Sequence, residues 1–336
     1  MDSNVAPPAE SAYQDRHAGL IVFGILGILL GLACLLLAPL AYFGQMMAAA
    51  RTGTELNRGN ALLGVMIYGL LGTVMIWLSI GSILARRWAR ALILCGGWIG
   101  LIIGLVAMPV VWVALGSVGP AAAAQGHALP PAALVLVRWI TLGVTFVIYI
   151  VIPGLTVLFY RGRNVRLTCE ARDPVARWTD RCPLPVLALC LLKAFSAGFL
   201  LLFLFTTYGH IFPLFGSIVQ GVPARILWVA LVAFLLYAAR GFYRLDRRVY
   251  WTYLAGALLL WSSSFVTFLR VDMVDYYRLA GMPERQLAHI AQNPLMAHNT
   301  LALVNVATMV VGLAYLLYVK RFFPAAATDH PAAVAG

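Results

Sequence analysis

Lys193 is the clearest candidate for chemistry in this 336-residue chain, because it lies in the middle of a long apolar run. A charge inside a membrane span costs roughly 2.5–3.5 kcal/mol on insertion scales, so it is a functional candidate by default. Lys193 lies nine residues beyond Leu184, which places it about 13 Å along a helix axis. Polar residues of two later apolar runs can approach a similar depth: Ser262, Ser263, Ser264 and Asn305. One cation among these groups predicts a substrate-binding site for an anion, a carboxylate or a lipid headgroup.

The alternative for Lys193 is a structural role. A long basic side chain can extend its amine along the span towards the membrane surface, or donate hydrogen bonds to backbone carbonyls. No Asp or Glu lies well inside any apolar run. This argues against a carboxylate relay for protons or cations, and against a retinal Schiff base, which needs an acidic counter-ion. The sequence leaves both roles of Lys193 open.

Other residue types that carry chemistry do not form a known pattern. Four histidines follow apolar runs, at His127, His210, His289 and His298, but no pair has HxxH or HxxxH spacing. Cys169 and Cys182 have twelve residues between them and no histidine, which is not the spacing of a zinc site. The chain contains no Walker loop, HExxH, GxSxG or dinucleotide fingerprint. We therefore predict no metal site, no cofactor and no catalytic residue.

The elements that position these residues must be membrane helices. Hydrophobic residues make up 62% of the chain and charged residues 11%, against about 45–50% and 25% in a soluble domain. A span needs about 20 apolar residues. Eight runs qualify or nearly qualify: Ala18–Phe43, Ala61–Leu84, Ala91–Leu115, Ala132–Tyr160, Leu184–Thr207, Ala224–Ala239, Val249–Leu269 and Thr300–Val319. The sequence predicts an all-α polytopic protein with about eight transmembrane helices.

The basic residues predict the orientation of these helices. An even number of spans places both termini on one side, and that side carries sixteen basic residues against seven on the other. Basic loops stay in the cytoplasm, so both termini are predicted to be cytoplasmic, in a bacterial inner membrane. The net charge of +12 lies in short clusters between spans and not on one surface. We therefore expect the lipid bilayer as a partner, and no nucleic acid.

A duplicated unit of four helices is the predicted organisation. The turns Gly81–Arg90 and Gly241–Tyr250 both begin with glycine and reach an arginine pair within seven residues. Their offset of 160 residues predicts two parallel copies, at 18–160 and 184–323. A cytoplasmic tail (1–17), a polar linker (161–183) and a flexible tail (324–336) complete the division. The alternative is that basic turns between membrane helices simply resemble one another.

Glycines four residues apart predict close helix packing, because small residues let the backbones of membrane helices approach each other. One helix carries Gly27 and Gly31, and another carries Gly96, Gly100 and Gly104. In the polar segment Val271–Ala297, aromatic and aliphatic residues among charges favour an amphipathic helix on the outer membrane surface.

The linker is the most polar part of the chain. It holds three acidic residues and six arginines: Arg161, Arg163, Arg166, Arg172, Arg177 and Arg181. These arginines are candidates for contact with a protein partner or with anionic headgroups. A solvated linker that pairs its own charges is the alternative.

Three functions remain compatible with the sequence. The first is a non-catalytic component of a membrane complex, such as a scaffold, an assembly factor or a subunit. The second is a transporter for a small anionic or lipidic solute, with its site at Lys193. The third is a lipid-modifying enzyme that uses the outer histidines. We rank them in this order.

Overall fold

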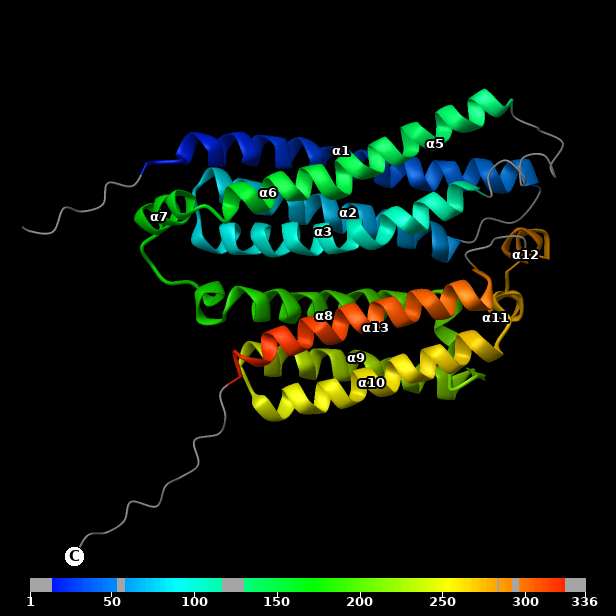
Figure 1. Ribbon diagram of the computed structural model, residues 1–336. Coiled ribbons are helices and arrows are strands. Elements are labelled where there is room, and N and C mark those ends of the chain that lie inside the picture. The colour runs from blue at the N-terminus through cyan, green and yellow to red at the C-terminus, as the bar shows by residue number, and fades with distance from the viewer. Residues whose placement is uncertain (1–13, 53–57, 117–129, 283, 292–295, 324–336) are drawn as a thin grey trace, which may run out of the picture. The chain divides into compact units, whose positions relative to one another are not determined.

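The chain is an all-α membrane protein, as the sequence predicts (Figure 1). The computed structural model describes residues 14–52, 58–116, 130–282, 284–291 and 296–323. Within these ranges, eight helices are long and apolar enough to cross a membrane. They correspond one to one with the eight predicted runs, which confirms the predicted multi-pass architecture.

The spans begin and end at bounds somewhat wider than the apolar runs. The first three helices are α1 (His17–Thr52), α2 (Arg58–Ile83) and α3 (Arg87–Gly116). The fourth span joins α5 (Pro131–Phe146) to α6 (Ile152–Tyr160) through a π-helical turn at Val147–Val151. Pro153 lacks the amide hydrogen that an α-helix would use there, so the wider turn directly before it has a local cause.

The last four spans are α8 (Leu184–Phe203), α9 (Val222–Tyr243), α10 (Arg247–Arg270) and α13 (His298–Lys320). The run Ala224–Ala239 is short for a span, and α9 gains length by including flanking residues on both sides. α8 ends four residues before the predicted end at Thr207, and a β-hairpin follows it.

This hairpin is an element that the sequence analysis missed. Strands β1 (Ile211–Leu214) and β2 (Ser217–Gln220) pair antiparallel, with Ile211 opposite Gln220. The turn residues Phe215 and Gly216 have φ of 45° and 82°, as a tight two-residue hairpin turn requires. The apolar residues of the hairpin extend the preceding hydrophobic run, so hydropathy alone cannot separate strand from helix here.

The segment Val271–Ala297 contains two short helices, where a single amphipathic helix was predicted. They are α11 (Met273–Leu279) and α12 (Glu284–Ala291). Between them Gly281 has a φ of 81°, a left-handed conformation that ends α11.

The chain divides into two compact units, which we describe separately. Unit 1 comprises residues 1–56, 64–101 and 149–181, and unit 2 comprises residues 57–63, 102–148 and 182–336. Unit 1 contains α1, most of α2, the first half of α3, α6 and the segment that follows α6. Unit 2 contains α8 to α13 and the hairpin, together with the start of α2, the second half of α3 and all of α5.

Glycines bring the helices of unit 1 together. A Cβ added at Gly31 of α1 would lie 2.7 Å from Cγ1 of Ile76 and 2.9 Å from the carbonyl oxygen of Gly72, both on α2; Gly27 faces Ser79 in the same way. On α3, however, Gly96 faces open space, while Gly100 lies against Pro153 of α6. The packing glycine that the spacing missed is Gly97, whose added Cβ would lie 2.9 Å from Val157. Gly104, further along α3, is buried.

The turns of the proposed repeat have the same backbone conformation. The fifth residue of each turn has a positive φ, 51° at Ala85 and 57° at Leu245. The amide of the next residue donates to the carbonyl of the initial glycine, Gly81 or Gly241, at 2.9 Å in both turns. A Cβ on either glycine would overlap the residue eight positions later. The two turns, 160 residues apart, therefore share a backbone conformation as well as a basic composition. The duplication of the four-helix unit itself stays a prediction.

We expect Gly241→Ala to lower the thermal unfolding temperature in detergent, because its Cβ would overlap the side chain of Val249. Overpacking of this kind costs about 1–3 kcal/mol. Leu245→Gly should have the opposite effect, because glycine relieves the cost of a positive φ. Gly198→Ala in α8 is the control, since its Cβ would meet no atom within 4 Å. Equal unfolding temperatures for the two alanine variants would contradict this account.

Candidate functional site

Lys193 lies against an aromatic ring of unit 2. Its Nζ is 5.1 Å from the ring centroid of Tyr253, a cation–π geometry. Tyr253 lies six residues after Arg247, the first residue of α10, so it is about 9 Å from the start of that helix. α8 and α10 start at the same end of unit 2 (Figure 1). The Lys193 ammonium therefore lies beside a ring in the first half of α10, as counted from the start of that helix.

The serines predicted to accompany Lys193 lie further along α10. Ser263 is buried, and its hydroxyl oxygen accepts a hydrogen bond from the amide of Phe215 at 3.0 Å. Thr267, one helical turn later, accepts from the amide of Gly216 at 3.0 Å. These two bonds fasten the tip of the hairpin to α10. Ser263 is ten residues beyond Tyr253, about 15 Å along the axis.

The remaining predicted site residues complete this picture. Ser262 is exposed and Ser264 is half-buried, while Asn305 of α13 is buried and its Oδ1 accepts no hydrogen bond within the described chain. In the described ranges, no hydrogen bond joins Lys193 to these serines or to Asn305. Ser263 and Asn305 lie towards the hairpin end of unit 2, whereas the Lys193 ammonium lies at the level of Tyr253.

The arginine-rich segment after α6 has regular secondary structure. It contains α7 (Arg163–Arg172) and a 3-10 turn at Trp178–Arg181. We call residues 161–181 the arginine platform. Its centre is Asp173, only 2% exposed. The Asp173 carboxylate accepts from the Arg177 guanidinium at 2.9 Å and from the Arg87 backbone amide at 3.3 Å, and the Arg86 guanidinium lies 3.7 Å away.

Asp173 acts as a helix cap supplied from a different element. Arg87 is the first residue of α3, and the first amides of a helix have no partner within it. In the equivalent turn of unit 2, Asp246 directly precedes α10 and accepts from the amide of Arg248 at 2.8 Å. Arg86 occupies the position of Asp246 in unit 1, so the carboxylate for α3 comes from the platform. The Arg177 hydrogen bond, followed by the Arg87 amide, holds the Asp173 pKa below its usual value.

Further contacts tie the platform to its surroundings in unit 1. Arg87 lies 3.6 Å from Glu170 and 3.4 Å from Asp180. The residues before α1 contribute two more contacts. Asp15 pairs with Arg172 at 3.1 Å, and the Arg16 amide donates to Thr168 at 3.0 Å.

Only part of the predicted arginine set remains available to a partner. Arg166, Arg172 and Arg177 pair with acidic residues of unit 1. By contrast, Arg161, Arg163 and Arg181 are exposed and form no ion pair with any described residue. Two apolar side chains of the platform are exposed as well: Val175 at 61% and Trp178 at 44%. The platform therefore exposes both basic and apolar side chains.

The thiols and histidines have structural surroundings. Cys169 and Cys182 are buried free thiols, and burial raises the pKa of each to about 11, so little thiolate exists near neutral pH. His210 and His298 bond to the carbonyls of Leu279 and Phe268. His127 and the side chain of His289 fall outside the described residues. Among those described, no group of three or more His, Cys, Asp or Glu residues is placed to hold a metal ion.

No known protein family, curated protein or solved structure matches this chain. The functional argument therefore rests on the residues themselves.

We expect Asp173→Ala to release the platform and expose Cys169 to alkylation at pH 8, because the α3 cap and the Arg177 pair are lost together. Removing one partner of a buried ion pair costs about 3–5 kcal/mol. The measurement is the alkylation rate of the Cys169 peptide by mass spectrometry. Asp15→Asn, which removes an exposed pair, is the control and should leave the rate unchanged. A slow rate in both variants would show that Asp173 does not hold the platform.

Acid should release the platform in the wild-type protein. Because folding lowers the Asp173 pKa, the ionised carboxylate stabilises the fold fully at pH values above the pKa that Asp173 has in the unfolded chain. This stabilisation is lost as the pH falls through the lowered pKa that Asp173 has in the folded state. The measurement is digestion by an acid protease at pH values between about 5 and 2. We expect cleavage within the platform only at the lowest pH values of this range. Cleavage that is equally fast at pH 5 would contradict the assignment.

Proposed function

We propose that this protein is a non-catalytic component of a membrane complex: a scaffold, an assembly factor or a subunit. In this proposal it lies in a bacterial inner membrane, with both termini and the arginine platform in the cytoplasm. The observation that carries the proposal is the ordered platform around Asp173. The excess of basic residues on that side of the predicted topology supports the orientation.

A connection between two membrane units does not need an ordered structure. Fixing each residue of a segment costs about 1–2 kcal/mol of backbone entropy, and here the cost is offset by buried contacts. Val165, Thr168, Cys169 and Asp173 are all buried. A segment that is held in one conformation by its own acidic residues presents its outer side chains in a fixed arrangement, which favours recognition.

The exposed side chains suggest the chemistry of the partner. Tryptophan and arginine are the residues most enriched at the energetic centres of protein interfaces. The platform presents Trp178 and Val175 together with Arg161, Arg163 and Arg181. A protein surface that combines carboxylates with an apolar patch would complement this face. We infer an acidic protein partner in the cytoplasm or at the membrane surface.

The test is the composition of the particle extracted from its native membrane in mild detergent. We expect a second polypeptide in fixed ratio and a particle mass above that of the 36.5 kDa chain with its detergent. Neutralising Arg161, Arg163 and Arg181 to Gln should release that polypeptide. The matched control neutralises three exposed arginines of unit 2 to Gln: Arg240, Arg244 and Arg248. A lone chain, or equal loss in both variants, would contradict the proposal.

A transporter for a small anionic solute is the second candidate. It is favoured by one observation: the ammonium of Lys193 lies in a span over a neutral ring, and no ion pair neutralises it within the described chain. Lys193→Met should then abolish uptake into vesicles while leaving insertion unchanged. Lys193→Arg keeps the charge and serves as control. Uptake that persists in the Met variant would remove Lys193 from any transport pathway.

A further inference from the structure

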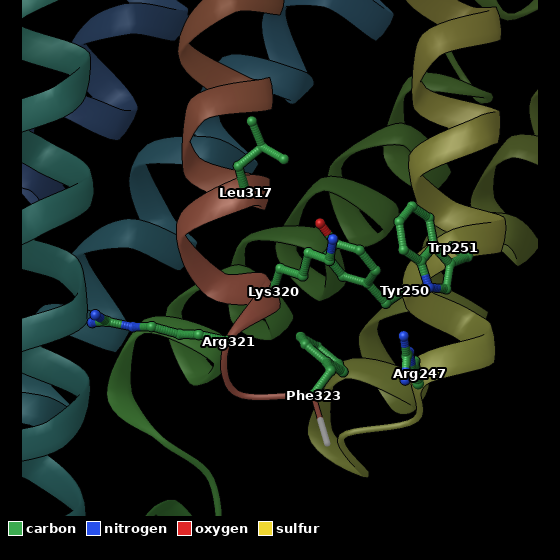
Figure 2. Close-up of a pocket in the computed structure, with 7 residues that line it drawn as sticks. All are labelled: Arg247, Tyr250, Trp251, Leu317, Lys320, Arg321 and Phe323. Carbon is green, nitrogen blue, oxygen red and sulfur yellow. The ribbon is translucent and has the colours of Figure 1, made fainter. Parts of the chain in front are cut away.

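The start of α10 and the end of α13 form a pocket of about 370 Å³ in unit 2, a volume within the usual range of small-ligand sites. Figure 2 shows its side chains coming from these two helix ends. Arg247 and Lys320 supply cations, while Trp251 and Leu317 supply apolar surface. The pocket lies where two membrane spans reach the membrane surface, on the side predicted to be basic.

Within the described residues, the cations at this end of unit 2 have no acidic partner. Arg247 and Lys320 form no ion pair with any described residue, nor do the neighbouring Arg244 and Arg248. Asp246, next to Arg247 in sequence, already accepts the amide of Arg248 as a helix cap. In unit 1, by contrast, acidic residues of the platform pair with Arg86 and Arg87 at the equivalent turn. An excess of positive charge beside a membrane attracts anions.

Two aromatic side chains that line the pocket, Tyr250 and Phe323, are buried and held by contacts within unit 2. Tyr250 is 1% exposed, and its hydroxyl donates to the carbonyl oxygen of Leu316 at 3.0 Å. Phe323, which is 6% exposed, packs on Tyr250 with ring centroids 5.1 Å apart. The Nζ of Lys320 lies 5.0 Å from the Trp251 ring. A ligand would therefore meet a preformed surface with the ammonium already placed over it.

Arg321 lines the pocket, but its guanidinium group lies elsewhere. Its guanidinium lies 4.2 Å over the ring of Tyr318, and Figure 2 shows it pointing away from the other lining side chains. The charges available to a ligand are therefore those of Arg247 and Lys320.

We propose that this pocket binds the headgroup of an anionic phospholipid, with the phosphate between Arg247 and Lys320. The exposed faces of Trp251 (44%) and Leu317 (63%) lie beside the cations and offer contact to the acyl chains. A soluble phosphate would use the two charges and leave this apolar surface uncovered. The pocket shares no residue with the arginine platform, so the proposal does not depend on the protein partner proposed above.

The test is native mass spectrometry of the purified full chain in detergent, titrated with dioctanoyl phosphatidylglycerol. We expect one saturable lipid. Because each interfacial cation contributes roughly fivefold in affinity, Arg247→Gln with Lys320→Gln should weaken binding about tenfold or more. Arg244→Gln with Arg248→Gln removes the same charge from side chains that do not line the pocket and should weaken binding clearly less. Arg247→Lys with Lys320→Arg keeps both charges and should retain binding.

Two further probes distinguish the sources of the phosphate. Dioctanoyl phosphatidylcholine carries the same chains without net charge and should not compete. Glycerol phosphate carries the charge without chains, and displacement of the lipid at equal concentration would assign the pocket to a soluble phosphate and overturn the proposal. Equal weakening by both neutralised pairs would also overturn it, because binding would then follow total charge. An unchanged unfolding temperature shows that the Gln variants are folded. Retained binding in a folded Arg247→Gln, Lys320→Gln variant would exclude the pocket.

Discussion

Hydrocarbon contains no water to satisfy a backbone amide, so a segment that crosses it alone satisfies its own amides as a helix. That requirement accounts for the eight spans and moves the unsolved hydrogen-bonding problem to their ends, where the first amides of each helix have no internal partner. At α10 the problem is solved locally by Asp246. At α3 the equivalent position is Arg86, and the carboxylate comes from Asp173, more than eighty residues later in the chain. The order of the arginine platform follows from this one exchange.

The different sources of the capping carboxylate also give the two turns different acidic neighbours. The turns at Gly81 and Gly241 share one backbone conformation. Yet the arginines beside the first turn meet the carboxylates of Asp173, Glu170 and Asp180, while those beside the second meet none among the described residues. In unit 1, three arginines of the folded platform pair with acidic residues. The turn of unit 2 keeps cations that form no ion pair with any described residue, and they lie beside an aromatic pocket, which is the arrangement suited to an anionic ligand.

The spans themselves are simpler than their ends. Polar side chains in unit 2 serve the fold where their partners are known: Ser263 and Thr267 hold the hairpin tip, and Tyr250 bonds across to α13. Lys193 rests on Tyr253, a position that a snorkelling lysine and a solute-binding lysine would share. The contact with Tyr253 does not distinguish these two roles. Transport stays a second candidate function because Lys193 carries a charge inside a span.

The sequence by itself determined the helical class, the eight spans and the basic turns, because hydropathy and charge act within about twenty neighbouring residues. It also indicated close packing at Gly27 and Gly31, a pattern of local spacing. It missed the hairpin, since apolar strand and apolar helix have the same hydropathy, and it chose Gly96 where Gly97 makes the contact. Only the tertiary structure decided which arginines of the linker are paired and which are free, and that Arg247 and Lys320 share a pocket. Those facts depend on residues distant in the chain, such as Asp173 and Arg87, whose pairing no local pattern records.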